Sequence, residues 1–483
     1  MRKAMGVSTT FVNGVVTAWA ILALAPPARG QQVAPPDPSA QLPKTPIAAS
    51  VQGSLTIAAV GDLLGPGLPV SQLPDPGFDA VARILRGADI ATGNNEGSLF
   101  DFRTFPGYPA AQNGGGDPVY DASVARDLKA MGFTILSKAN NHAFDFGLEG
   151  LEATNRALDE AGILHVGSGR DLSDALSPVF ITTPKGRVSF VATASTFNPA
   201  SPAADPQGDL NGRPGISVLR TQRVTLVTAA EMSELRAMAS ARGQRVDSTR
   251  KDLYLFEQRW RVSDRPGLAY KMNPFDESAL LHAVRGAKQL SALTVFTIHA
   301  HEAASEDLDG EDPVPADFTH VLFHNVIDAG ADMVMVHGPH HLRGIEIYKG
   351  KPIFYSLSSF FFDLELDRAP PNTETMERMG MDPKRVTYSE YLSARFRIPP
   401  DAPFFRSVVA VTTFEGDHVK EIRLYPILLN RAGHLFGIPY PAPPADAKRI
   451  IEELAKLSAP YGTRIDFENG VGVIRVAAPS ASK

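Results

Sequence analysis

Residues Ser137–Gly147 read SKANNHAFDFG and follow an expected buried strand, Met131–Leu136. The stretch puts two Asn and one His on the short turn between that strand and a helix expected at Leu148–Ala161. Such a turn is poor core material, but an Asn amide oxygen can bind a hard cation, and an imidazole can bind metal or pass a proton. The order of strand, polar turn and helix predicts an α/β protein with a functional turn at a strand end.

Polar side chains follow other apolar runs in the same way. Gly61-Asp62 comes after the expected strand Ser54–Val60, and Glu96 lies in GNNEGSL. The residues placed at expected strand ends are Asp62, Glu96, Asn141, His142, His299, His337 and His340. One such residue alone would usually be a cap or a turn former. In an α/β sheet, however, reactive residues gather where the carboxyl ends of the strands meet their loops, so the whole set predicts one site.

Strands and helices alternate along most of the chain. The expected helices are Phe78–Arg86, Ala122–Met131, Leu148–Ala161, Glu277–Leu290 and Ala316–Ala329. The expected strands are Ser54–Val60, Ile90–Thr92, Phe133–Leu136, His165–Val166, Arg187–Ala194, Leu293–Ile298, Met333–Val336 and Pro352–Tyr355. Because the strands are nearly all apolar, the pattern predicts a sheet covered by helices on both faces.

Two regions differ from this alternation. Residues 195–275 have weak periodicity, several Pro and Gly, and the aromatic-charged piece LYLFEQRWR, so we expect an inserted loop or subdomain near the site. The main domain is expected over residues 54–370, and residues 371–477 are expected to be a β-rich part that completes the fold. In that part, the alternating strands Ser407–Phe414 and Val419–Tyr425 read as a hairpin. A helix at Ala445–Leu457 and a strand at Val471–Ala477 should follow, with a frayed tail after them.

The N-terminus is typical of an exported protein. Residues 1–30 have a charged start, an apolar run at Phe11–Ala25, and the small-x-small cleavage pattern Ala28-Arg29-Gly30. Residues 31–50 are rich in Pro, Ala and Gln, which predicts a linker. We expect the protein to lie in the periplasm or at the cell surface after cleavage. The alternative is an uncleaved membrane anchor.

Composition limits the chemistry of the site. The chain has no cysteine, so a metal ion would be held by nitrogen and oxygen ligands. The formal net charge of −6 argues against nucleic acid as a partner. Carboxylates and imidazoles at one edge match a two-metal hydrolase, in which the ions activate a bridging water and polarise a phosphoryl or carbonyl oxygen. Mixed His, Asp and Asn ligands favour Mn, Fe or Zn over Mg or Ca.

The chain also resembles the CapA proteins of poly-γ-glutamate capsule synthesis, a branch of the calcineurin-like metallophosphoesterase superfamily. The resemblance covers Ile57–Asp363 and rests on AAVGDLLGPG, GNNEGSL, LSKANNHAFDFGLEGL, TIHAHE and AGADMVMVHGPHHLRGIEIYKGKPIFYSLSSFFFD. The chain departs from the family pattern at three places. GNNEGSL replaces Asn-Leu-Glu-Gly but keeps Glu96, HAHE replaces His-Trp-Gly-x-Glu, and YSLSSF lacks the Gly-Asn that normally follows Tyr-Ser-Leu.

The resemblance implies a four-layer αββα fold and a site for divalent metal ions, expected to be two in number. The residues that look like metal ligands are Asp62, Glu96, Asn141, His299, His337 and His340. His142 looks like the residue that protonates a leaving group. Asp145 would either orient His142 or cap the helix that begins near Leu148.

These observations predict an exported, metal-dependent hydrolase that acts on a phosphoester or an amide of a capsule or envelope polymer such as poly-γ-glutamate. The alternative is a non-catalytic component that binds this anionic polymer within a capsule synthesis and export complex, together with membrane-bound partners. The intact ligand set favours the enzyme, because a binding module needs no such set. A phosphatase that scavenges phosphate is a third candidate, but it does not account for the motif block.

Several other histidines and acidic residues are also candidates. His320 and His324 are four residues apart and share one face of their helix, but a structural role is expected because that helix is amphipathic. His301 and Glu302 lie closer to the expected site and could touch substrate or metal, but a structural role is expected. His341 should point away from the site. The acidic run EDLDGED, residues 306–312, does not fit a calcium-binding loop.

Some basic and aromatic residues are also candidates for substrate binding. Arg343, Lys349 and Lys351 could bind an anion, but surface roles are expected. The cluster of Tyr254, Phe256 and Trp260 could form a wall for a polymer chain, but burial under the insert is the more common arrangement.

Overall fold

The structure is a computed structural model that describes residues 50–66, 74–110, 118–305, 312–363, 373–387, 390–391, 394, 402–431 and 435–476. The expected signal at 1–30, nearly all of the linker at 31–50, residues 306–311 of the acidic run and the tail lie outside these residues. Within them, none of the helices is both long and apolar enough to cross a membrane.

The larger sheet is ten-stranded and is built around β1. Its order is β23-β24-β21-β20-β1-β2-β5-β6, with β19 beside β1 and β22 beside β21. Its strands are β1 (Ser54–Leu64), β2 (Ile90–Asn95), β5 (Phe133–Ser137), β6 (Leu164–Val166), β19 (Ser359–Phe362), β20 (Arg406–Glu415), β21 (His418–Leu429), β22 (Pro439–Pro441), β23 (Asp466–Glu468) and β24 (Val471–Arg475). The strands β1, β2, β5 and β6 are parallel, while β20 runs antiparallel to β1. The C-terminal hairpin thus extends the sheet that the N-terminal half begins.

The second sheet is six-stranded, in the order β17-β18-β16-β15-β9-β8. Its strands are β8 (Val179–Thr183), β9 (Gly186–Ala194), β15 (Leu293–His299), β16 (Met333–His337), β17 (Ile345–Tyr348) and β18 (Lys351–Phe354). The strands β9, β15, β16 and β18 are parallel, so their carboxyl ends lie at one edge. The strand β17 was not predicted. It pairs antiparallel with β18 and lies at the edge of the sheet.

The two sheets pack face to face. Their shared core joins Ile57 and Ile135 of the first sheet to Phe190 and Val295 of the second. A second core lies between the first sheet and the helices α1 (Pro76–Arg86), α2 (Val124–Met131) and α3 (Gly147–Ala161). A third lies between the second sheet and α6 (Pro274–Gln289) and α7 (Asp317–Ala329). The helix α10 (Pro444–Ser458) adds apolar side chains to the core between the sheets.

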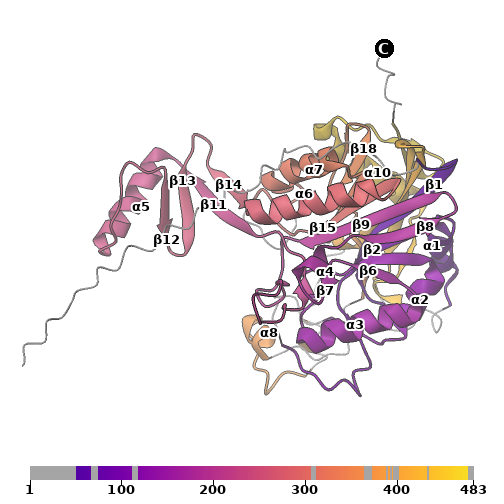
Figure 1. Cartoon of the computed structure of the whole chain (residues 1–483), viewed down its shortest axis with the longest axis horizontal. Helices are drawn as coiled ribbons and strands as arrows, with labels where there is room; N and C mark the ends of the chain where they lie inside the picture. The colour runs from indigo at the N-terminus through magenta and orange to yellow at the C-terminus, as the bar shows by residue number, and fades with distance from the viewer. Residues whose placement is uncertain are drawn as a thin grey trace, which may run out of the picture. The chain divides into compact units, whose positions relative to one another are not determined.

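The chain is therefore a mixed α/β protein in which helices, sheet, sheet and helices follow one another (Figure 1). The strand pattern alone predicted one sheet with helices on both faces, and that prediction was wrong. An apolar strand shows that both of its faces are buried, but it does not show whether a helix or a second sheet covers them.

Most expected elements are present, and the differences at their ends have local causes. The helix α6 begins three residues before the expected Glu277, because the side chain of Asn273 caps it and Pro274 occupies its first turn. The helix α3 ends as expected at Gly162, which adopts φ +71°. The strand β1 runs four residues beyond Val60, so Asp62 lies inside the strand.

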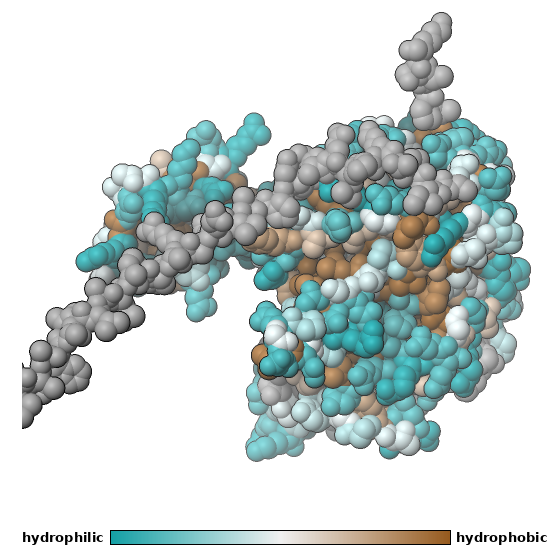
Figure 2. Space-filling model, in the orientation of Figure 1, coloured by the Kyte–Doolittle hydropathy of each residue, from teal (hydrophilic) through white to brown (hydrophobic). Residues whose placement is uncertain are grey.

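Residues 215–272 contribute to two small sheets, and only the second of these is made from this stretch alone. The pair β7 (Ser168–Gly169) and β10 (Gly215–Ile216) is followed by a four-stranded sheet in the order β12-β13-β11-β14. Its elements are β11 (Thr221–Val227), α5 (Ala229–Ala241), β12 (Asp252–Leu255), β13 (Gln258–Val262) and β14 (Gly267–Met272). Met232 and Leu253 belong to a core confined to these elements. The insert is thus a folded subdomain, with mainly hydrophilic residues on the face seen in Figure 2.

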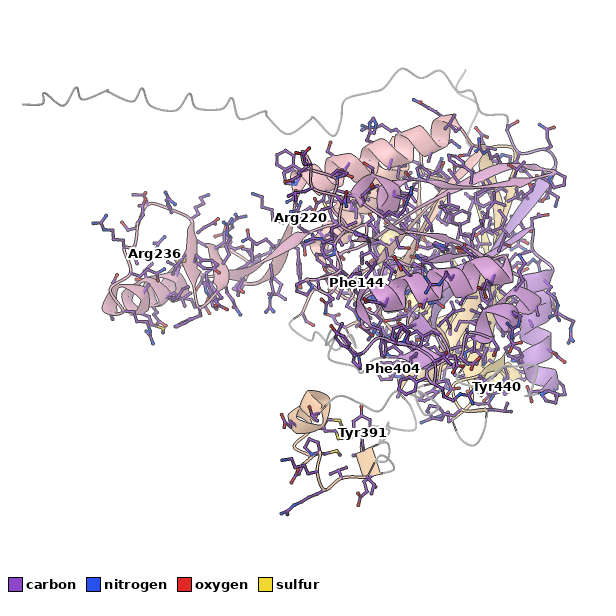
Figure 3. The ribbon with its side chains drawn as sticks, turned by 60° about the horizontal axis from the view of Figure 1, so that its bottom comes forward. Phe144, Arg220, Arg236, Tyr391, Phe404 and Tyr440 are labelled. Carbon is purple, nitrogen blue, oxygen red and sulfur yellow. The ribbon has the colours of Figure 1, made fainter. Side chains whose placement is uncertain are left out.

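The aromatic piece of the insert is the hairpin β12–β13. Trp260 is half-buried and donates from Nε1 to the carbonyl oxygen of Leu255 at 3.1 Å. Tyr254 and Phe256 remain 57% and 54% exposed, so the expectation of a buried cluster was wrong for these two. Arg220, labelled in Figure 3, precedes β11, and its guanidinium forms two bonds of 2.6 and 2.8 Å with the Asp276 carboxylate in α6.

Candidate metal centre

Neighbouring strands bring the expected residues to one edge. His299 and His337 are the last residues of β15 and β16, and they pair directly in the register of those two parallel strands. Glu96 follows β2 in the other sheet, where Asp62 of β1 pairs with Asn94. Because parallel strands end at the same edge, residues far apart in the sequence come into contact there.

Asp62 lies where β1 changes its neighbour. The strand pairs with β20 up to Ala59 and with β19 from Asp62 onward, and the register shifts at this point. The Asp62 amide donates to the carbonyl oxygen of Ser358 at 3.1 Å. A Cβ on Gly61 would lie 1.6 Å from the same oxygen, so only glycine permits this close approach of the two segments.

Three imidazoles face the Asp62 carboxylate. The Nδ1 atoms of His299, His337 and His340 lie 4.0, 3.8 and 3.7 Å from its oxygens. The carboxylate also accepts from Asn94 Nδ2 at 2.8 Å and from the Gly338 amide at 2.9 Å. These two bonds fix the direction of the carboxylate.

Glu96 supplies the second carboxylate of the cluster. Its Oε1 lies 3.8 Å from His299 Nε2 and 3.9 Å from His142 Nε2, and the side chain is fully buried. Ligand atoms of Asp62, Glu96 and His340 lie within 4.8 Å of one another. The structure therefore brings together Asp62, Glu96, His142, His299, His337 and His340.

Several buried polar atoms of the cluster have no hydrogen-bond partner among the described residues. They are both carboxylate oxygens of Glu96, His299 Nε2 and both ring nitrogens of His337. The buried side-chain oxygen of Asn141, the residue before His142, also has no partner among the described residues. An unsatisfied buried polar atom costs about 1–3 kcal/mol. Divalent cations would satisfy these atoms, and an all nitrogen and oxygen set suits Mn, Fe or Zn.

Burial also tunes the charge of the cluster. It raises the pKa of Asp62 to about 7, and it raises the pKa of Glu96 well above its usual range, with the Asp62 charge as the next cause. Burial lowers the pKa of His337 to about 3 and holds the pKa values of His299 and His340 far below their usual range. The imidazoles are therefore neutral, with lone pairs free for a metal ion, while bound cations would displace protons from the carboxyl groups.

His142 and Asp145 form a buried pair beside the cluster. His142 Nδ1 lies 2.6 Å from Asp145 Oδ2, and the His142 amide donates to the side-chain oxygen of Asn140 at 3.1 Å. The N-cap position of α3 is Phe146, one residue after Asp145. With Nδ1 held by a carboxylate, Nε2 faces Glu96 and is placed for proton transfer.

Some residues of the site were not singled out by the sequence. Asn140 Nδ2 donates to Asn94 Oδ1 at 3.0 Å and so links the turn after β5 to the end of β2. Lys138 is buried and lies 3.1 Å from the carbonyl oxygen of Gly97, and burial lowers its pKa to about 7. These residues all lie inside the motifs SKANNH and GNNEGSL, where polar residues clustered at strand ends were the available signal.

His301 belongs to the same cluster. Its ring centroid lies 4.9 Å from that of His299, and its buried Nε2 has no hydrogen-bond partner in the described part of the chain. Ligand atoms of Glu96, His299 and His301 lie within 4.8 Å of one another. Glu302 instead accepts from the hydroxyls of Ser195 and Thr196 at 2.9 and 3.0 Å.

The basic residues after the site do not share one role. Arg343 is 1% exposed, so the expectation of a surface role was wrong for it, and it donates to the carbonyl oxygen of Glu302 at 3.2 Å. Lys349 pairs with Asp328 at the surface, and the amine of Lys351 contacts the buried Asp332 carboxylate.

The departure at YSLSSF has a structural consequence. Ser358 stands where the resemblance places Gly, and it adopts φ +66°, a region that glycine favours. Its hydroxyl donates to the carbonyl oxygen of His340 at 2.9 Å. The next residue, Ser359, places its hydroxyl 3.1 Å from His340 Nδ1. Both serines therefore hold the loop that carries His340.

Residues 56–364 match the family described as bacterial capsule synthesis protein PGA_cap. The chain belongs to this family. The protein y4sH of Sinorhizobium fredii, described as uncharacterized, is 40% identical over 445 residues, which cover 89% of this chain and 95% of y4sH. The Bacillus subtilis PGA biosynthesis protein CapA is 27% identical over 236 residues, which cover 49% of this chain and 44% of CapA.

Two solved structures are similar at low scores. A hypothetical protein from Thermus thermophilus has a TM-score of 0.35 and 12% identity, and the match covers 77% of this chain and 98% of that one. A Staphylococcus aureus protein described as a candidate 5'-nucleotidase, in complex with alpha-ketoglutarate, has a TM-score of 0.31 and 9% identity over 83% of this chain and 58% of that one.

Proposed function

We propose that this PGA_cap family member is an exported, metal-dependent hydrolase of the metallophosphoesterase type. The observation that carries the proposal is the buried cluster of unpaired carboxylate and imidazole atoms with the His142–Asp145 pair beside it. The residues that would hold metal ions, two in number, are Asp62, Glu96, Asn141, His299, His337 and His340. Bound ions would supply an activated water and would polarise the bond to be cut.

The remaining chemistry belongs to the chain itself. Asp145 would accept a hydrogen bond from Nδ1–H and stabilise the doubly protonated, charged form of His142. Its Nε2–H could then give a proton to the departing oxygen or nitrogen. The family description, bacterial capsule synthesis protein, supports a substrate related to the capsule. We propose a phosphoester or an amide of a capsule or envelope polymer, such as poly-γ-glutamate, with the protein in the periplasm or at the cell surface.

A polymer-binding role without catalysis is the second candidate. It is favoured by one observation, the description of the family and of CapA as capsule synthesis proteins. In that role the protein would hold an anionic polymer and work beside membrane-bound synthesis partners. The metal cluster would then bridge polymer carboxylates to the protein.

The test combines metal analysis with substrate screening. Purified protein should contain Mn, Fe or Zn and should cut model phosphoesters or γ-glutamyl amides. His142→Ala should lower turnover by about 10²–10⁴-fold at near-normal metal content, because it removes a general acid and keeps the ligands. His282→Ala, an exposed change on α6, is the matched control. Metal-loaded protein without hydrolase activity, but with polymer affinity, would favour the second candidate.

A further inference from the structure

A second group of metal-binding side chains lies between α7 and β17. His320 and His324 come from the helix, and Glu346 comes from the strand. One ligand atom of each residue lies within 4.8 Å of the others. None of the three belongs to the centre described above.

The helix spacing explains how the two imidazoles meet. Residues four apart share one face of a helix, and the ring centroids of His320 and His324 are 4.1 Å apart. The neighbouring side chains Leu322 and Phe323 pack into the core under the second sheet and so fix the rotation of α7. Glu346 then enters from the edge strand β17, a contact that the sequence spacing could not reveal.

One of the two distances to the carboxylate already suits a tetrahedral ion, and the other is a hydrogen bond that an ion would replace. His324 Nε2 lies 2.7 Å from Glu346 Oε1, and His320 Nδ1 lies 3.5 Å from Glu346 Oε2. With bonds of about 2.0–2.2 Å, ligand atoms of a tetrahedral Zn²⁺ lie about 3.3–3.5 Å apart. Small side-chain rotations therefore separate the first pair enough to admit an ion. Two imidazoles and one carboxylate leave a fourth position for water.

Neighbouring side chains orient these ligands. The Tyr355 hydroxyl donates to Glu346 Oε2 at 2.9 Å, and it also lies 3.1 Å from His320 Nδ1. The His324 ring stacks on Tyr348 with centroids 3.6 Å apart and an interplanar angle of 12°. These contacts hold the Glu346 carboxylate and the two imidazole rings in place.

Exposure makes the group reachable from solvent. The side chain of His320 is 52% exposed and that of His324 is 23% exposed, whereas Glu346 is 9% exposed. A buried carboxylate below two accessible imidazoles offers a charge partner to an entering cation. We propose that His320, His324 and Glu346 bind a Zn²⁺-like divalent ion that ties α7 to the edge strand β17.

The position of this site gives it a structural consequence. The helix α7 follows the segment that begins with His301, and β17 follows His337, the last residue of β16, and the turn that carries His340. An ion held between α7 and β17 would therefore join two elements that each follow residues of the metal centre in the chain. Its binding should therefore stabilise the folded chain without being required for turnover.

Zn²⁺ titration tests the proposal in a background without the first centre. Asp62→Ala combined with His337→Ala removes two ligands of that centre, and equilibrium dialysis followed by elemental analysis then counts the remaining ions. We expect one Zn²⁺ per chain and a rise in Tm on adding Zn²⁺. Adding His320→Ala and His324→Ala should abolish both effects, whereas adding His282→Ala should change neither.

Two outcomes would overturn the site: no Zn²⁺ bound in the background variant at micromolar free Zn²⁺, or unchanged binding after loss of both histidines. If the protein with Asp62→Ala and His337→Ala does not fold, the Zn²⁺ count is instead compared between wild type and a variant changed only at His320. His320→Gln, at an exposed position, should then lower the Zn²⁺ count by one per chain, and an unchanged count would reject the proposal. The count does not depend on hydrolase activity, so its failure is separate from failure of the proposed function.

Discussion

Replacing Asp62 with Asn should stabilise the metal-free protein, and the gain should increase with pH. Asp62 is fully buried, and burial raises its pKa from 3.8 to about 7. Because the folded state binds this proton more tightly than the unfolded chain, ionising the group in the folded state costs stability. The cost is absent well below pH 3.8, increases as pH rises from 3.8 to about 7, and is constant above that.

The magnitude follows from the two pKa values. A difference of about three units corresponds to about 4 kcal/mol at pH 8, and only about 1.6 kcal/mol has developed at pH 5. The Asp62 carboxylate accepts bonds from Asn94 and Gly338. An amide has one acceptor oxygen for those two donors, which costs about 1–2 kcal/mol at every pH. We therefore expect Asp62→Asn to gain about 2–3 kcal/mol at pH 8 and almost nothing at pH 5.

Urea unfolding of metal-free wild type and Asp62→Asn at pH 5 and pH 8 measures this difference. Asp264→Asn, at an exposed position, is the matched control and should show no pH-dependent gain. Saturating Mn²⁺ or Zn²⁺ should reverse the order of stability, because the ion binds the wild type more tightly than a variant that has lost a ligand. A difference between wild type and Asp62→Asn that is equal at both pH values would refute the reasoning.

Three further outcomes are expected. Asp145→Asn should lower turnover at least tenfold with metal content unchanged, because His142 loses its orienting carboxylate; steady-state kinetics and elemental analysis check this. Metal affinity should rise about tenfold per pH unit below pH 7, since the ion displaces the Asp62 proton, and calorimetry in buffers of different ionisation enthalpy would detect the released proton. Gly61→Ala should destabilise the protein by more than about 3 kcal/mol in urea unfolding, because its Cβ meets the Ser358 carbonyl, whereas Gly286→Ala, with open space around it, should be neutral or stabilising.

The position of the metal centre was accessible from sequence because it depends on a simple geometric rule. Parallel strands end at one edge, so polar residues that follow apolar runs must lie near one another. The direct pairing of His299 with His337 across β15 and β16 is the clearest case. Asp62 obeyed the rule less strictly, since it lies within β1, at the point where that strand exchanges β20 for β19.

Features that depend on packing were not accessible in this way. The apolar strands gave no sign that two sheets face each other, because burial by a sheet and burial by a helix leave the same pattern. The insert showed weak periodicity because its strands are short and partly exposed, as in β13. Arg343 was expected at the surface because arginine usually lies there, and only its tertiary contacts with the site loop explain its burial.

The charge of the centre decides how the two proposed functions can be separated. Without bound cations, Asp62 and Glu96 are either protonated or mutually repelling. Burial keeps the imidazoles of His299, His337 and His340 neutral. These five side chains offer no positive charge to an anionic polymer, so polymer binding at them needs metal ions as much as catalysis does. Polymer binding does not need the His142–Asp145 pair. The 2.6 Å contact in this pair orients the His142 imidazole for proton transfer. Loss of turnover in His142→Ala with retained metal and retained polymer affinity would therefore identify an enzyme, because a pure binding module has no use for that proton.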